Sequence, residues 1–297
     1  ETQRIDPQFI MAYWGEALTY EHPLWSQFDT EASRSALAKL GSTPEQRVAT
    51  APTEREKAYL RSVNILFGEG SQEEREIAYS SALEEIYRQY PDDIDAAALH
   101  ALSLLTISHG GRDFSLYIRA GAITEDILDR NPRHPGALHY NIHSFDDPVH
   151  APLGLRAADA YAVVAPSAVH ALHMGSHIYF ALGMWEKGSE RNARSFEEAM
   201  IRRSSQDDPI PRQGYHALTW LIYSLTQEGK RGEAREKLAI IEDQVEKFKS
   251  PQHRQNFISA RASYVIDTQE FSGHFAQVAV DYEGLAPFFV ATDQYVR

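Results

Sequence analysis

Two stretches, His134-Pro-Gly-Ala-Leu-His139-Tyr-Asn-Ile-His143 and His170-Ala-Leu-His173-Met-Gly-Ser-His177, place histidines at matching positions along the chain. A shift of 34 residues carries His139 and His143 onto His173 and His177, and it carries Pro132 onto Pro166. A period near 34 residues with a proline closing each unit is typical of tetratricopeptide-type helix pairs. The sequence therefore predicts an all-α fold, a right-handed solenoid of stacked antiparallel helix pairs.

Helix starts and turns extend this pattern along the chain. Thr53-Glu-Arg-Glu56 and Ser71-Gln-Glu-Glu74 have the spacing of capping boxes, in which the hydroxyl accepts from a backbone N–H and the glutamate reaches back. No sustained alternation of apolar and polar residues predicts a strand. We expect helices at residues 11–17, 53–67 and 71–89, one ending near 108, one ending at 130, and further helices at 135–147, 151–164, 167–182, 186–202, 212–228, 231–248 and 251–268.

The length of the chain, 297 residues, suits one continuous solenoid. We interpret residues 1–297 as a single domain. Because Asp6-Pro7 is typical of a turn between repeats, the chain is expected to open inside a repeat whose N-terminal part is missing. The start at Glu1 and the lack of cysteine favour a processed, exported or periplasmic protein, with a cytoplasmic location as the alternative.

Composition and missing motifs exclude several classes of function. A net charge of −13 argues against nucleic-acid binding, which needs a basic patch or stripe. No apolar run approaches the length of a membrane span. The chain has no cysteine, so disulfides and thiolate metal sites are excluded. It also lacks the phosphate-binding loop, the dinucleotide-binding glycine pattern, the HExxH zinc motif and the GxSxG nucleophile turn.

The histidine pairs predict a site. Side chains four residues apart share one face of a helix. In stacked helix pairs the first helix lines the inner, concave surface, and both pairs align with positions that face it. Asp146 and Asp147 follow His143 by three and four residues, so we expect them to continue its stripe. The predicted groove then holds His139, His143, His170, His173 and His177, with His216 as a further candidate.

This donor set suits a transition metal. Neutral imidazole is a good ligand for Zn, Cu, Fe and Ni, and pairs on adjacent helices could converge on one ion completed by a carboxylate. Tyr140 and Tyr179 could supply hydroxyl groups beside the site. A metal with an open coordination position would activate water or oxygen. Two alternatives stay open: a polar ligand groove without metal, and structural hydrogen bonding among the histidines.

Weaker candidates lie outside the two stretches. The polar groups of His109-Gly-Gly-Arg-Asp113 could reach the mouth of the groove, or Arg112 and Asp113 could pair in solvent. Glu16 and His22 lie in an aromatic segment with Trp14 and Trp25, whose rings we expect in the core.

Several of these segments together resemble a family of bacterial tetratricopeptide-repeat proteins over residues 6–200. The resemblance implies a helical-repeat fold, a site shared by these segments and an export signal, but no particular reaction. One departure is Gly175, where that family has proline, which implies a different bend beside His173 and His177. The segments that carry the resemblance are Met11-Ala-Tyr-Trp-Gly-Glu16, His22-Pro-Leu-Trp25, Ser108-His-Gly-Gly-Arg-Asp113, His134-Pro-Gly-Ala137, His143-Ser-Phe-Asp-Asp-Pro148 and His173-Met-Gly-Ser-His-Ile-Tyr179.

The function that the sequence favours is metal-dependent chemistry on, or binding of, a small molecule in the groove, through a divalent Zn, Cu or Fe ion. One alternative is a scaffold that binds a peptide or protein in the same groove without metal. Such grooves usually capture carboxylates with Lys, Arg and Asn, whereas this one is lined by His and Asp. A second alternative is a metal-free enzyme that pairs a groove histidine with Asp146 or Asp147 for acid–base catalysis.

Overall fold

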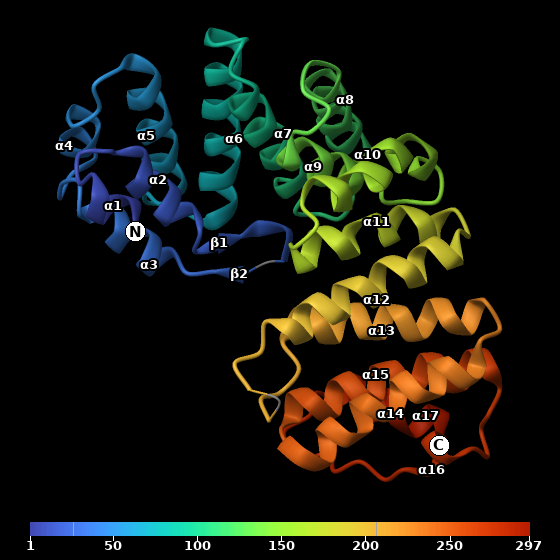
Figure 1. Ribbon diagram of the computed structural model, residues 1–297. Coiled ribbons are helices and arrows are strands. Elements are labelled where there is room, and N and C mark those ends of the chain that lie inside the picture. The colour runs from blue at the N-terminus through green and yellow to red at the C-terminus, as the bar shows by residue number, and fades with distance from the viewer. Residues whose placement is uncertain (26, 206) are drawn as a thin grey trace. The chain divides into compact units, whose positions relative to one another are not determined.

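The computed structural model describes residues 1–25, 27–205 and 207–297, and helices dominate it (Figure 1). Within the described part, no helix has the length and apolar character that crossing a membrane would require. The elements in chain order are α1 Thr2–Ile5, α2 Met11–Leu18, β1 Glu21–His22, η1 Pro23–Trp25, β2 Gln27–Phe28, α3 Thr30–Ala38, α4 Pro44–Ala49, α5 Glu54–Leu66, α6 Gln72–Gln89, α7 Ile94–Thr106, α8 Phe114–Arg130, α9 Pro135–Phe145, α10 Ala151–Val164, α11 Val169–Ala181, α12 Trp185–Ile201, α13 Arg212–Gln227, α14 Arg231–Phe248, α15 Pro251–Thr268, α16 His274–Gln277 and α17 Pro287–Val296.

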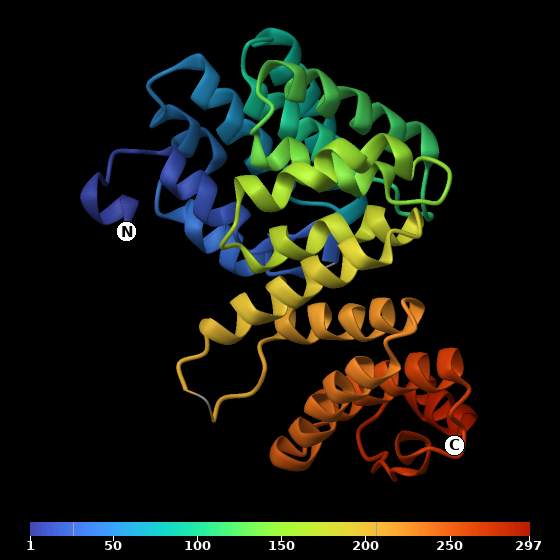
Figure 2. The ribbon, with the colours of Figure 1, turned by 45° about the vertical axis from the view of Figure 1, so that its right-hand side comes forward.

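The chain packs as two compact units, Glu1–Ser144 and Phe145–Arg297. In the first unit, α5 packs on α6, α6 on α7, and α7 on α8. In the second, each helix from α10 to α15 packs on the next one along the chain (Figure 2). This succession of neighbouring helix pairs is the all-α repeat arrangement that the 34-residue period predicts. A single domain over residues 1–297 stays a prediction.

Caps fix the helix starts in the first unit. Ser71 and Glu74 form the complete capping box at the start of α6. At α5 the Thr53 hydroxyl accepts from the Glu56 amide, but the Glu56 carboxylate accepts from that hydroxyl instead of from a backbone amide. The buried side chains of these helices form one cluster that includes Leu60, Leu83 and Ile86.

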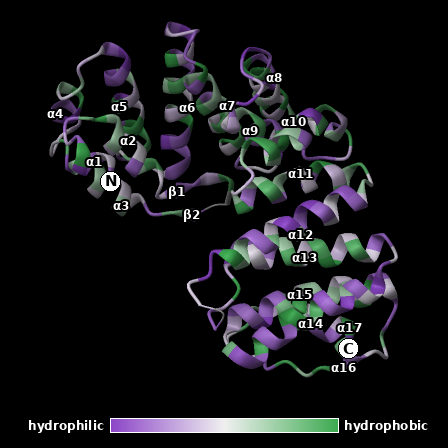
Figure 3. Ribbon diagram, viewed as in Figure 1, coloured by the Kyte–Doolittle hydropathy of each residue, from purple (hydrophilic) through white to green (hydrophobic). Residues whose placement is uncertain are grey.

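Two glycines end the first helices of pairs in the second unit. Gly183 and Gly229 have φ values of +68° and +76°, which glycine adopts without steric cost. After each, the next amide donates to a carbonyl five residues back, at Tyr179 and Leu225. These bonds satisfy carbonyls at the ends of α11 and α13 and turn the chain into the second helix of each pair. Figure 3 shows apolar and polar residues alternating along α13, α14 and α15.

Helices α10 and α11 approach closely at two glycines. A Cβ atom built on Gly175 would lie 2.8 Å from the carbonyl oxygen of Ala158, and one on Gly154 would lie 2.7 Å from Cδ1 of Ile178. In this chain the close packing of α10 on α11 requires glycine at position 175.

The structure corrects the expected elements at four places. A short antiparallel hairpin, β1 with β2, pairs Glu21 with Phe28, although no strand was expected. Helix α9 ends at Phe145 rather than at residue 147. Helices α3 and α4 fill a region for which we predicted none, and α16 and α17 form in the tail.

Candidate metal centre

The candidate site of the second unit begins with two histidines on α11. The Nε2 atoms of His173 and His177 lie 3.1 Å apart. His173 is only 2% exposed, whereas His177 is half-buried. Both rings lie on one face of the helix because they are four residues apart.

Asn192 on α12 fixes the tautomer of His173. The Asn192 side-chain amide donates to the Gly188 carbonyl at 2.8 Å, so its oxygen faces His173. That oxygen lies 2.7 Å from Nδ1 of His173. Because an amide oxygen only accepts, Nδ1 of His173 carries the proton and Nε2 presents a lone pair.

Asp146 fixes the tautomer of His177 in the same way. The Asp146 carboxylate lies 2.8 Å from Nδ1 of His177 and accepts its proton. Nε2 of His177 then also presents a lone pair, directed at Nε2 of His173. Two lone pairs 3.1 Å apart repel each other unless a cation lies between them. A cation placed between the two atoms would relieve this repulsion.

His216 on α13 supplies a third imidazole. Its ring centroid lies 4.4 Å from that of His173, and its side chain is exposed. One nitrogen from each of His173, His177 and His216 lies within 4.8 Å of the others. In a tetrahedral zinc site with Zn–N bonds of about 2.0–2.1 Å, ligand nitrogens are about 3.3 Å apart. A small closing movement of His216 would bring the three nitrogens to that separation.

Burial disfavours the protonated form of three imidazoles, those of His170, His173 and His216. Burial lowers the pKa of His173 well below its usual range, and neighbouring His177 and His216 lower it further. Burial also lowers the pKa of His170 to about 4, and the His170 ring lies 6.4 Å from that of His173. The pKa of His216 is lowered by desolvation and then by His177. Neutral imidazole is the form that binds metal ions.

Trp220 forms one wall of this cluster. Its ring lies 4.9 Å from the ring of His173 and 4.5 Å from that of His177. Trp220 also stacks on Phe180 at 4.9 Å. The indole therefore limits the rotation of both imidazoles and shields one side of the cluster from solvent.

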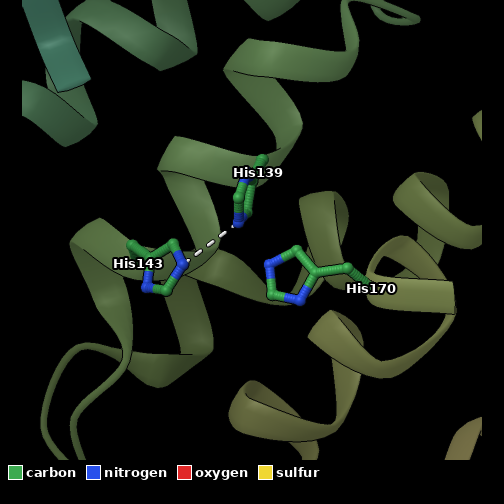
Figure 4. Close-up of side chains that lie close together, drawn as sticks. All are labelled: His139, His143 and His170. Carbon is green, nitrogen blue, oxygen red and sulfur yellow. Dashed lines mark hydrogen bonds between the residues drawn. The ribbon is translucent and has the colours of Figure 1, made fainter. Parts of the chain in front are cut away.

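The other histidine pair lies on α9, in the first unit. The Nε2 atoms of His139 and His143 are 3.1 Å apart, as Figure 4 shows. The same separation recurs in His173 and His177, although the angle between the two rings is 54° in the first pair and 80° in the second. Their convergence on one four-histidine groove stays a prediction.

The two aspartates predicted beside His143 have different roles. Asp146 binds His177, but it does so from the loop after α9 and not from a helix stripe. Asp147 instead binds Nδ1 of His150 and accepts from the amides of Val149 and His150. The predicted stripe is wrong because α9 ends at Phe145, before either aspartate.

The two tyrosines differ in their surroundings, and the Tyr140 ring lies 5.5 Å from the ring of His139. The Tyr179 hydroxyl donates to Asp159 at 2.7 Å, and Lys187 pairs with the same carboxylate. Tyr140 packs against a small apolar cluster with Leu104 and Leu105. The structure shows no contact of Tyr179 with the imidazoles among the interactions of the described residues.

The weaker candidates have local partners. His109 pairs with Glu76 at 2.5 Å, and Asp113 caps α8 through the Ser115 amide. Glu16 binds Lys39 and Gln3, while His22 is exposed in β1.

Arg112 is half-buried and has partners at the end of α9. Arg112 donates to the carbonyls of His143 and Ser144 at the end of α9 and lies 4.1 Å over the Tyr117 ring. It thereby holds the end of the helix that carries His139 and His143.

Asn192 and Trp220 are the site residues that sequence reasoning missed. Trp220 follows His216 by four residues, a spacing that places both on one face of α13. That spacing could have indicated Trp220. Asn192 carries no such signal, because it lies on the second helix of its pair and its role depends on how α12 packs against α11.

Comparisons with known proteins support the fold. No protein-family model matches the chain, and no curated protein matches it. Among solved structures, MamA from Desulfovibrio magneticus RS-1 covers 67% of this chain and all of its own, with a TM-score of 0.51 at 15% identity. A double mutant of the same protein covers 65% of this chain and 96% of its own, with a TM-score of 0.50 at 15% identity.

A human IFIT1 dimer with m7Gppp-AAAA covers 98% of this chain and 63% of its own, with a TM-score of 0.43 at 12% identity. MamA contains tetratricopeptide repeats. The fold of this chain is a tetratricopeptide-type helical repeat. At such low identity the likeness concerns the fold alone.

Proposed function

We propose that the second unit binds one divalent transition-metal ion through ring nitrogens of His173, His177 and His216. The observation that carries this proposal is the 3.1 Å contact between two Nε2 atoms whose Nδ1 protons are both held elsewhere. Asn192 and Asp146 act as the outer partners that orient metal-binding histidines and raise their basicity. His139 and His143 take no part in this site as proposed.

Three histidines around one ion leave a coordination position open, the arrangement of catalytic rather than structural zinc sites. A bound ion would supply Lewis acidity to a water molecule or to an oxygen of a small ligand at that position. His216 is exposed, which would give such a ligand access, and the Trp220 ring packs against the ring of His177. We therefore propose metal-dependent binding of, or chemistry on, a small molecule.

Metal loading tests the proposal. The purified chain is incubated with Zn, Cu or Fe, freed of excess ion, and measured by elemental analysis. We expect about one ion per chain, and a loss of that ion in His177→Gln and His216→Gln. His274→Gln is the matched control, because His274 is an exposed histidine of the same unit that pairs with Glu242. Circular dichroism verifies that each variant is folded.

Two outcomes would overturn the proposal. The first is wild-type protein that stays metal-free with all three ions. The second is metal binding that both His177→Gln and His216→Gln retain in full.

A second candidate function rests on the His177–Asp146 contact at 2.8 Å, a geometry suited to acid–base catalysis without metal. A chelator separates the two candidates in any substrate screen. An activity that a chelator leaves unchanged, but that Asp146→Asn reduces, favours the acid–base reaction. An activity that the chelator abolishes and zinc restores favours the metal.

A further inference from the structure

The first unit holds a pocket that is separate from the histidine cluster of the second unit. Its volume is about 360 Å³, and its walls come from α2, α5, α7 and the start of α9. This volume lies within the range of small-molecule sites. Apolar side chains form part of the wall, with Met11, Leu99 and the ring of Tyr140 among them.

A carboxylate lies at one side of the pocket. Asp95, whose side chain is 76% exposed, binds Nε2 of buried His134 at 3.1 Å. Nδ1 of His134 accepts from the Ala137 amide, so Nε2 carries the proton and donates to Asp95. His134 is therefore neutral and holds one oxygen of Asp95, while the charge of the carboxylate stays available to a ligand.

A cation and an aromatic wall complete the lining. The Arg55 guanidinium pairs with Asp93 at 2.6 Å and lies 5.4 Å over the ring of Tyr59. The Trp14 ring meets the same Tyr59 ring edge-on at 5.4 Å. Arg55 and Trp14 are thus neighbours around Tyr59, and both line the pocket.

The indole N–H of Trp14 is the unexplained group. Among the described residues it is buried and meets no acceptor. A buried donor without a partner is costly, and native structures usually explain each such group by a bound molecule or water. An acceptor on a ligand in this pocket would satisfy it.

We propose that this pocket binds a small zwitterion of the α-amino-acid class with an apolar side chain. Asp95 binds the ammonium group, and the Arg55 guanidinium and the Trp14 N–H bind the carboxylate. Met11, Leu99 and Tyr140 contact the apolar side chain. Both charges are needed because the Asp93 carboxylate already balances Arg55, so a simple anion would be repelled by Asp95.

The test uses the Trp14 indole signal in ¹H–¹⁵N spectra of the full chain, assigned with Trp14→Phe. The probes are L-phenylalanine, N-acetyl-L-phenylalanine and L-phenylalaninamide. We expect L-phenylalanine to shift the Trp14 signal to saturation, and each blocked compound to bind about tenfold or more weakly, since each lacks one charged hydrogen bond.

Variants assign the two charges. The Asp95→Asn variant should bind L-phenylalanine no more tightly than it binds N-acetyl-L-phenylalanine. The Arg55→Gln variant should bind L-phenylalanine no more tightly than it binds L-phenylalaninamide. Asp92→Asn is the control, because Asp92 is an exposed aspartate of the preceding turn that does not line this pocket. Wild-type affinity is expected there.

Measurements on the wild-type protein are sufficient to refute the proposal. The test therefore does not depend on whether each variant folds. Absence of any Trp14 shift with L-phenylalanine would overturn it. Equal binding of all three probes would overturn it as well, because the pocket would then recognise only the phenyl ring. Metal loading of the second unit tests a separate site and affects neither result.

Discussion

His100 on α7 is 1% exposed, and burial lowers its pKa from 6.5 to about 4. Between these values the unfolded chain binds a proton at this ring and the folded chain does not. The free energy of unfolding is therefore highest above pH 6.5 and falls as the pH decreases towards 4. His100 is thus expected to make the fold sensitive to acid.

We predict that His100→Leu reduces this acid sensitivity. For the wild type, His100 should account for about 2–3 kcal/mol of the loss in unfolding free energy between pH of about 7 and about 4.5. Urea unfolding of both proteins at the two pH values measures the difference. An equal loss in the variant and the wild type would contradict the prediction. The exposed His274→Gln serves as the control, with the wild-type loss expected.

Asn192 is a positioning residue for His173. Asn192→Leu removes the oxygen that accepts from Nδ1 of His173, so the ring is free to place its proton on Nε2 instead. Loss of such an outer partner typically weakens metal binding about 10- to 100-fold. We expect that decrease in a zinc titration, and substantial recovery in Asn192→Asp, which keeps an acceptor oxygen. Equal affinity of Asn192→Leu and the wild type would disprove the role.

At the scale of the element, the contact of α10 with α11 leaves no room at Gly175. Gly175→Ala would place Cβ 2.8 Å from the Ala158 carbonyl oxygen, and a backbone atom cannot rotate away. We expect the free energy of unfolding to fall by about 1–3 kcal/mol, as for other overpacked sites. The contact of His173 with Asn192 should loosen as α11 shifts.

The matched control is Gly232→Ala in α14, where an added Cβ meets no atom within 4 Å. There we expect a gain of about 0.5–1 kcal/mol, since alanine restricts the unfolded chain more than glycine. Thermal unfolding of both variants decides the matter. A Gly175→Ala protein as stable as Gly232→Ala would show that α10 and α11 can separate without cost.

Most helices could be predicted because their ends carry local signals. Helix α10 begins after the turn at Asp147-Pro148 and ends before Pro166, as these residues predict. The end of α9 was predicted two residues too late. The Asp147 amide donates to the Phe145 carbonyl, and this local turn ends the helix at Phe145. The β1–β2 hairpin has strands of two residues, too short to show an alternating pattern.

The sequence could predict those contacts of the candidate site that depend on helix periodicity alone. The pairing of His173 with His177 follows from a spacing of four residues. The partners Asn192 and Asp146 come from a different helix and from a loop, so only tertiary packing brings them to the two Nδ1 atoms. Separate roles for Asp146 and Asp147, adjacent in the sequence, arise because their side chains leave a loop in different directions.

At the scale of the whole molecule, the two units have separate apolar clusters. Leu83 belongs to a cluster of the first unit and Leu238 to one of the second, and both are fully buried. In repeat proteins each element is stabilised mainly by its neighbours, so local stability need not be uniform. Damage to one cluster should therefore remain in its own unit.

We predict that Leu238→Ala, at a cost of about 2–5 kcal/mol, speeds hydrogen exchange in α13, α14 and α15 and leaves α5 and α6 unchanged. Leu83→Ala should give the reciprocal pattern. Mass spectrometry of exchanged peptides measures both. Faster exchange along the entire chain in either variant would instead indicate one cooperative fold over residues 1–297.

At the proposed centre, a metal ion would compete with protons for the paired Nε2 atoms of His173 and His177. Folding already fixes both rings, so binding of the ion would cost little side-chain entropy. Proton release then sets the thermodynamics of binding. The apparent enthalpy should vary with the ionisation enthalpy of the buffer, and acid should compete with the ion directly. In effect, the proposed centre would respond to the ratio of metal activity to hydrogen-ion activity.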